Sequence, residues 1–259
     1  MTYCLAIRVD EGLVFMSDSR TNAGPDQIST HSKMHRFGGD GDRTLTLLSS
    51  GNLATCQSVV SKIRRDIRIG AKVSLLNVED LRAAAEYVGE MSIEEQEKHR
   101  VLRTDDKSEE FLPEANFILG GQIRGERPHI EHIYPQGNFV RASVSTPFLQ
   151  VGEVKYGKPI LDRIITRRTT LDAALKCALV SMDSSMRSNA TVGPPVEYHV
   201  YRTDTFSRGT HNVLEEDDEY LLGLRRAWAD NIRTAFENLP SAPLAVEESP
   251  RLTVPRSVS

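Results

Sequence analysis

An α+β domain built in layers is the fold class that this sequence predicts. Apolar stripes typical of helices occur in pairs, and runs of short strands joined by hairpin turns separate the pairs. The 259 residues are enough for one large domain, and 39% of them are hydrophobic, so a sizeable core can be buried. These observations alone do not choose between two layers and four.

The N-terminal elements are two strands that form a hairpin. Residues 3–9 (YCLAIRV) and 13–19 (LVFMSDS) have the composition of strands, and residues 10–12 (DEG) between them are typical of a tight turn. Antiparallel pairing returns the second strand to the start of the first. The hairpin therefore predicts that Asp18 lies beside Thr2.

Five further segments have apolar residues at helical spacing. They are 53–67, 78–88, 156–165, 171–182 and 221–239. Asn77 is expected to cap the second of these helices, and Pro159 is tolerated only in the first turn of the third. The remaining strands are expected at 45–49, 116–121, 129–134, 139–142 and 196–202.

Two segments lack such patterns. Residues 94–110 are nearly all polar and predict a solvated helix end or a mobile loop. After Leu239 the chain is rich in Pro and Ser without periodicity. A single domain at 1–240 is therefore expected, followed by a disordered tail at 241–259.

Composition excludes several classes of protein. The net charge is −4 and there is no basic stripe, so nothing supports nucleic-acid binding. No apolar run approaches the ~18 residues of a membrane span, and the N-terminus has no secretory signal pattern. The three cysteines have no CxxC spacing, and their odd number suits a reducing cytoplasm. Cys56 and Cys177 fall on apolar helical stripes and are expected in the core, and Cys4 is expected to be a packing residue.

Thr2 follows the initiator Met1, and this position carries the chemical hypothesis. If Met1 is removed, Thr2 has a free α-amine beside its hydroxyl, which makes it a nucleophile with its own base. Lys33 is a candidate for the positive charge beside it, and Asp18 is a candidate to orient that lysine. The alternative is that Thr2 is an ordinary second residue and the two charges belong to the surface.

Four separated motifs resemble one known family. They are residues 1–30 with SDSRTNAG at 17–24, LLSSGNLA at 47–54, VGEVKYGKPILDR at 151–163, and SMDSSMRSNATVGPP at 181–195. They resemble the N-terminal-nucleophile (Ntn) peptidases of the proteasome type, most closely the bacterial Anbu (ancestral β-subunit) branch. The resemblance implies a four-layer αββα sandwich, two antiparallel sheets between helical layers, with the active site at one end of the sheets.

The resemblance also implies roles for single residues. Thr2 would attack the carbonyl, Lys33 would activate it, Asp18 would hold Lys33, and the Gly51 N–H would bind the oxyanion. Glu153 stands where this type of site usually has a serine hydroxyl. Of an Asp-x-x-Ser motif that supports the nucleophile, the matching stretch 185–188 keeps only the second serine. Supporting candidates are therefore Ser185, Ser188 and Asp183, and the alternative is that they are polar residues at a helix end.

Other patterns in the sequence are weaker. His31 and His35 are four residues apart, but the segment is expected to be extended and lacks an HExxH glutamate, so no zinc site is expected. The glycine-rich stretch 38–41 is not followed by a Lys-Ser/Thr pair, so no phosphate loop and no cofactor are expected.

Three functional hypotheses remain. One is a threonine peptidase inside a homo-oligomeric ring or open ring, and another is an Ntn amidase for a specialised small amide or conjugate. The last is an assembly scaffold with vestigial catalytic residues. The resemblance adds a possible functional association with ATP-grasp-like and transglutaminase-like proteins.

Overall fold

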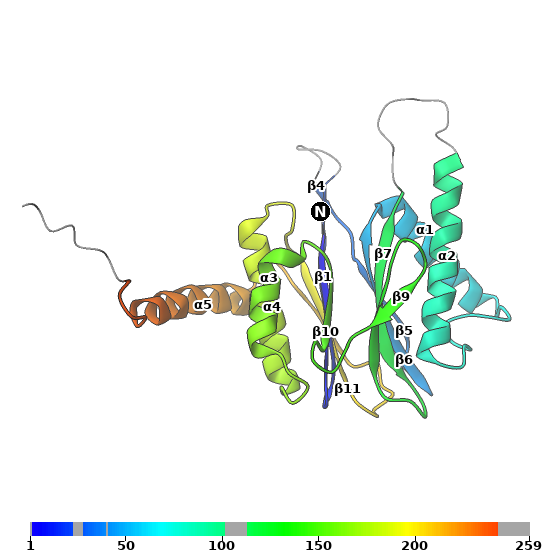
Figure 1. Ribbon diagram of the computed structural model, residues 1–259. Coiled ribbons are helices and arrows are strands. Elements are labelled where there is room, and N and C mark those ends of the chain that lie inside the picture. The colour runs from blue at the N-terminus through cyan, green and yellow to red at the C-terminus, as the bar shows by residue number, and fades with distance from the viewer. Residues whose placement is uncertain (1, 23–27, 40, 102–112, 243–259) are drawn as a thin grey trace, which may run out of the picture.

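The computed structural model describes residues 2–22, 28–39, 41–101 and 113–242, and Figure 1 shows their arrangement. One five-stranded antiparallel sheet has the order β10-β1-β2-β11-β12. Its strands are β1 (Tyr3–Val9), β2 (Gly12–Asp18), β10 (Phe148–Gly152), β11 (Val196–Arg202) and β12 (Thr210–Leu214). The N-terminal hairpin lies at its centre, because β10 pairs with β1 and β11 pairs with β2.

The second five-stranded sheet is an antiparallel meander that follows the chain in order. Its strands are β5 (Met34–Gly38), β6 (Arg43–Gly51), β7 (Ala115–Ile123), β8 (His129–Ile133) and β9 (Phe139–Arg141). A short ribbon of β3 (Arg20–Asn22) and β4 (Ile28–Thr30) follows β2 and leads into this sheet.

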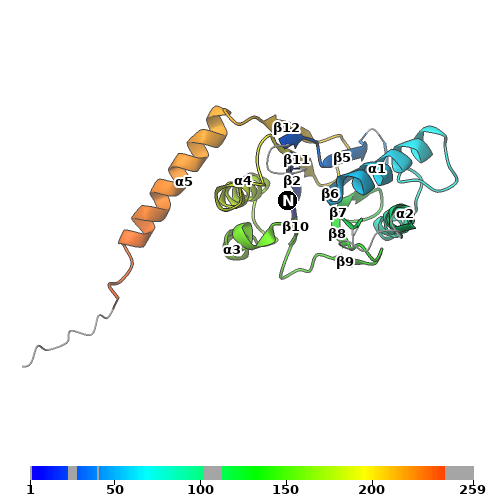
Figure 2. The ribbon, with the colours of Figure 1, turned by 90° about the horizontal axis from the view of Figure 1, so that it is seen from above.

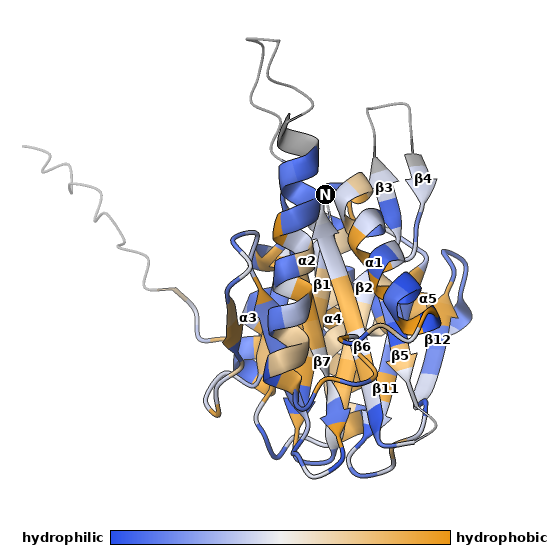
Figure 3. Cartoon of the chain, turned by 90° about the vertical axis from the view of Figure 1, so that its right-hand side faces the viewer, coloured by the Kyte–Doolittle hydropathy of each residue, from blue (hydrophilic) through white to orange (hydrophobic). Residues whose placement is uncertain are grey.

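Helices cover the outer face of each sheet (Figures 1 and 2). The first sheet packs on α3 (Val154–Ile164) and α4 (Leu171–Ser188), and the second packs on α1 (Leu53–Arg68) and α2 (Leu81–Val101). A third apolar cluster lies between the two sheets. Figure 3 shows the apolar strands between more polar helical surfaces. The last helix, α5 (Glu219–Glu237), extends away from this body (Figure 2).

Alternation along β1 decides which way the N-terminal residue faces. Tyr3, Leu5 and Ile7 belong to the cluster under α3 and α4, whereas Cys4 and Ala6 belong to the cluster between the sheets. Successive side chains of a strand point to opposite faces. The residue before Tyr3 therefore faces the second sheet.

Most of the predicted helices and strands are confirmed, with shifts of a few residues at their ends. The strands β5, β10 and β12 and the β3–β4 ribbon were not predicted, because each is short and carries no clear alternation. Cys4, Cys56 and Cys177 are all buried, as expected. The expected disordered tail lies outside the described residues from 243 onward, as does 102–110 of the polar segment. None of the described helices combines the length and apolar character needed to cross a membrane.

Three details of the helices differ from prediction. Asp80 rather than Asn77 caps α2, because the Ala83 N–H donates to Asp80 Oδ1 at 2.7 Å. Pro159 lies in the second turn of α3, since the helix begins at Val154, two residues earlier than expected. The last helix ends at Glu237, so Leu239 lies beyond it.

Candidate active site

Neighbouring strands hold the backbone of Thr2 on both sides. The Thr2 carbonyl accepts a hydrogen bond of 2.8 Å from the Glu153 N–H, and the next N–H, that of Tyr3, donates to Asp18 Oδ1 at 3.0 Å. Gly152 makes this approach possible, because a Cβ there would lie 1.9 Å from the Thr2 carbonyl oxygen. Its φ of 86° is also one that glycine adopts readily.

Lys33 and Asp18 form a buried ion pair next to this backbone. Lys33 Nζ lies 2.6 Å from Asp18 Oδ1 and donates a second bond of 2.8 Å to the Arg20 carbonyl. Lys33 is 6% exposed and Asp18 is fully buried. The other carboxylate oxygen, Oδ2, accepts from the Gly193 N–H at 3.3 Å. One oxygen of Asp18 therefore contacts both the lysine ammonium and the peptide group that follows Thr2.

Burial is the largest influence on the Asp18 carboxyl. It raises the pKa of Asp18 above the ordinary range, and the Lys33 charge and the N–H donors oppose this rise. The ionised state of Asp18 therefore depends on Lys33, and the two side chains act as one unit.

Local structure explains how these residues meet. Asp18 ends β2, where it pairs in register with Val196 of β11. Lys33 directly precedes β5, and its carbonyl accepts the Ser49 N–H of β6 at 3.0 Å. The pair therefore joins the two sheets at the end where the chain begins.

Gly51 is the last residue of β6 and lies at the same end of the second sheet. It has a φ of 118°, and a Cβ there would lie 2.4 Å from the Glu114 carbonyl oxygen. The next residue, Asn52, caps α1 by accepting the Thr55 N–H at 3.0 Å. Gly51 thus lies where a strand turns into a helix N-terminus, a place whose N–H groups suit a developing negative charge.

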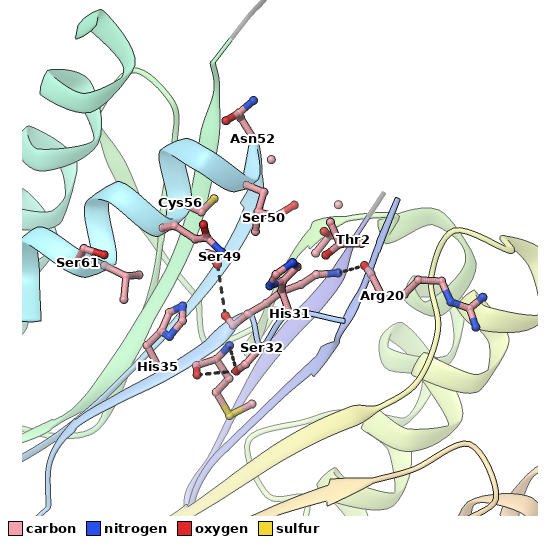
Figure 4. Close-up of a pocket in the computed structure, with 18 of the residues that line it drawn as sticks. Thr2, Arg20, His31, Ser32, His35, Ser49, Ser50, Asn52, Cys56 and Ser61 are labelled. Carbon is pink, nitrogen blue, oxygen red and sulfur yellow. Dashed lines mark hydrogen bonds between the residues drawn. The ribbon is translucent and has the colours of Figure 1, made fainter. Parts of the chain in front are cut away.

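A cavity of about 1030 Å³ opens between these elements (Figure 4). Thr2, Lys33, Gly51 and Gly152 line it, together with residues of β5, β6 and α1. Small hydroxyl side chains, Ser49 and Ser50 among them, lie at the end next to Thr2 (Figure 4). None of the described lining residues is an aspartate or a glutamate.

The serine candidates occupy a different part of the fold. Ser185 is buried in α4, where its hydroxyl donates to the Ser181 carbonyl at 3.1 Å. Ser188 is the exposed last residue of the same helix. Asp183 forms a 2.6 Å ion pair with Arg225 of α5. None of these candidates is among the described residues that line the cavity.

Glu153 lies one residue beyond the glycine that touches Thr2. It is buried at the N-terminus of α3, and its Oε2 has no hydrogen-bond partner in the described part of the chain. Lys155 Nζ is 3.6 Å from that oxygen. A buried carboxylate thus stands close to the N-terminal strand.

His31 and His35 both line the cavity. Burial lowers the pKa of His35 to about 4, helped by the nearby charge of Arg64. The described residues contain no group of three or more side chains placed to hold a metal ion.

Two contributors to the site were not identified from the sequence. Gly152 and Gly193 act through the close approach of their backbones, which no periodic pattern encodes. Gly152 stands in the motif at 151–163, but the resemblance drew attention to the neighbouring Glu153 and not to the glycine. Cys56 was expected only in the core, but it also lines the cavity (Figure 4).

The two sheets, their helical cover and the site at the N-terminal strand define a proteasome-like fold. No family model and no curated protein sequence matches the chain. Solved structures match it over nearly its whole length. Anbu from Yersinia bercovieri is 43% identical over 93% of this chain and 99% of its own, with a TM-score of 0.87.

Two others agree with the first. Anbu from Pseudomonas aeruginosa, solved as a helical assembly, is 45% identical over 93% of this chain and 98% of its own, with a TM-score of 0.87. A Gly-1 mutant of Anbu from Hyphomicrobium sp. strain MC1 is 40% identical over 94% and 100%, with a TM-score of 0.85. The chain belongs to the Anbu, or ancestral β-subunit, family.

Proposed function

We propose that this protein is a threonine amidohydrolase of the Ntn type, in which Thr2 cleaves peptide or other amide bonds once Met1 is removed. One observation carries the proposal: the buried Lys33 ammonium and the peptide N–H after Thr2 share one oxygen of Asp18. A buried ion pair is costly to maintain and is weak evidence for stability alone. Its place beside a residue with a hydroxyl and a potential α-amine supports a chemical role.

The proposed reaction has two halves. Thr2 Oγ attacks the carbonyl carbon while its proton passes to the Thr2 α-amine, a group whose ordinary pKa is about 8. Lys33 stabilises the developing alkoxide, and the Gly51 N–H stabilises the oxyanion. The C–N bond then breaks, and the α-ammonium returns the proton to the leaving amine. Water, activated by the same α-amine, attacks the resulting ester and releases the acid.

The fold supports this assignment. Three apolar clusters separate helices, sheet, sheet and helices, which is the order of layers in an αββα Ntn sandwich. Gly152 leaves room for the Thr2 backbone, because a Cβ there would lie 1.9 Å from the Thr2 carbonyl oxygen. Ser185, Ser188, Asp183 and Glu153 remain candidates for a supporting role, and Glu153 is the nearest to Thr2 along a neighbouring strand.

Assembly into a homo-oligomer is part of the proposal. The relative from Pseudomonas aeruginosa forms a helical assembly, and here α5 extends from the body with exposed apolar side chains. Ile232 is 48% exposed and Phe236 is 73% exposed. A second copy that covers this face through a heterologous contact would form a ring or an open ring. Light scattering at micromolar concentration tests this, and a monomer there would count against a compartmentalised enzyme.

The catalytic proposal is tested by covalent labelling. The protein is incubated with a β-lactone probe, which acylates nucleophilic threonines, and intact mass then reports both Met1 removal and probe addition. We expect Met1 to be absent, one probe per chain, and no label on Thr2→Ala. Label that persists on Thr2→Ala would place the nucleophile elsewhere. Amide hydrolysis by protein that keeps Met1 would refute the α-amine mechanism.

A further inference from the structure

The cavity next to Thr2 is a groove along one face of α1. The residues of this helix that line it recur at helical spacing: Leu53, Cys56, Gln57, Val60, Ser61 and Arg64. Leu53 follows Gly51 and Asn52 at the end that holds Thr2. Arg64 is eleven positions after Leu53, which corresponds to a rise of ~16 Å along the helix axis. Arg64 therefore marks the far end of the groove from the nucleophile.

Arg64 is the uncompensated cation of this groove. Lys33 is neutralised by Asp18, and the Arg20 guanidinium turns away from the cavity to donate to the Ala190 carbonyl (Figure 4). In the described part of the chain no carboxylate forms an ion pair with Arg64, and none of the described lining residues is acidic. The Arg64 side chain instead donates a 3.4 Å hydrogen bond from Nη2 to His35 Nδ1.

His35 adds a second donor at the same place. A guanidinium only donates hydrogen bonds, so His35 Nδ1 accepts and the proton of a neutral ring lies on Nε2. The ring is neutral near pH 7, because burial lowers the pKa of His35 to about 4. The far end of the groove therefore combines the Arg64 guanidinium, which can donate two parallel hydrogen bonds, with the N–H of His35. Such a set of donors matches the two oxygens of a carboxylate.

We propose that Arg64 and His35 bind a carboxylate of the substrate, held three to five residues from the scissile bond. The inference rests on the proposed function of Thr2 and names the substrate class of that site. An extended peptide rises ~3.3 Å per residue, so ~16 Å corresponds to about five residues. The reach of the arginine side chain toward Thr2 shortens this span. The carboxylate comes from an Asp or Glu side chain or from a chain terminus.

The end of the groove next to Thr2 has a different chemistry. Ser49 and Ser50 line it, and Cys56 follows on α1 (Figure 4). These side chains are small or neutral, so they do not select a charged residue at the cleaved bond itself. The proposal therefore predicts selectivity for acid at a distance, with little charge preference at the two residues joined by the scissile bond.

Cleavage of a peptide library tests this position by position. The assembled protein, free of Met1, is incubated with a proteome-derived peptide mixture, and mass spectrometry identifies the cleaved bonds. We expect Asp, Glu or a terminal carboxylate to be enriched about tenfold at one position three to five residues away. Enrichment of internal Asp and Glu indicates side-chain recognition, and enrichment of sites near peptide ends indicates terminal carboxylates.

Two variants assign the preference to Arg64. Arg64→Gln should abolish the enrichment while cleavage continues, and Arg64→Lys should keep part of it. Arg68→Gln removes the same charge from the last turn of α1 outside the cavity, so it should keep the full enrichment. Cleavage without distant acid preference, or a preference that survives Arg64→Gln, overturns the inference and leaves the proposed function intact. Absence of any cleavage that depends on Thr2 overturns both.

Discussion

The Gly152→Ala variant tests whether the contact between Gly152 and Thr2 positions the nucleophile, as distinct from stabilising the fold. An alanine Cβ would lie 1.9 Å from the Thr2 carbonyl oxygen and 2.7 Å from its carbonyl carbon, at least ~1 Å inside contact distance. Both neighbours are backbone atoms, so Thr2 must move to relieve the clash. A displacement of about 1 Å at a reacting group costs about 10²-fold in rate. The φ of 86° adds strain of about 1–2 kcal/mol, which lowers the Tm by about 2–8 °C.

The assay compares the rate of covalent labelling of Thr2 by a β-lactone with the Tm of the same sample. Gly125→Ala is the matched control, because Gly125 has a φ of 93° and nothing within 4 Å of the added Cβ. Gly152→Ala should lose at least as much stability as Gly125→Ala, because it adds the clash to the strain that the two share, and only Gly152→Ala should label about 10²-fold more slowly. A folded Gly152→Ala protein that labels at the normal rate would show that this contact does not position the nucleophile.

Two further predictions follow from the site and the core. Thr2→Ala and Lys33→Ala should each cost nearly as much turnover as the double variant, because groups that act as one unit lose activity non-additively, and Asp18→Asn should retain somewhat more. His199 is buried between the sheets and accepts from Thr46 while donating to the Arg208 carbonyl, and burial lowers its pKa to about 4. The unfolded chain, with a histidine pKa of about 6.5, binds more protons between pH 6.5 and 4. Stability should therefore fall by about 3 kcal/mol as the pH drops through that window, which urea titrations of wild type and His199→Gln can measure.

The N-terminal hairpin shows what the sequence predicts well. A glycine turn between two apolar runs determines which residues pair, so the sequence alone was enough to place Asp18 at the start of β1. This prediction depends only on local chain geometry. Gly51 was likewise expected beside the site from its motif, and it lies at the end of β6 next to the cavity.

Other features depend on contacts that no local pattern encodes. Lys33 reaches Asp18 because the segment before β5 crosses from one sheet to the other, a contact that the hairpin geometry which placed Asp18 does not predict. The ion pair of Asp183 with Arg225 joins residues 42 positions apart, so the sequence left Asp183 as a possible site residue. Gly152 contributes by lacking a side chain where its backbone approaches that of Thr2. A single sequence contains no pattern that predicts such a close approach.

Removing either partner of the buried ion pair should affect stability unequally. Lys33→Ala leaves a carboxyl whose pKa burial already raises, so Asp18 can take up a proton and avoid a stranded charge. Asp18→Asn keeps an amide oxygen that can accept from Lys33 but removes the negative charge that neutralises this nearly buried ammonium, and such a loss costs about 3–5 kcal/mol. Urea unfolding at pH 7 should therefore find Asp18→Asn the less stable variant, although it is expected to be the more active one. Equal stability of the two variants, or the reverse order, would mean that Asp18 does not depend on Lys33 for its charge.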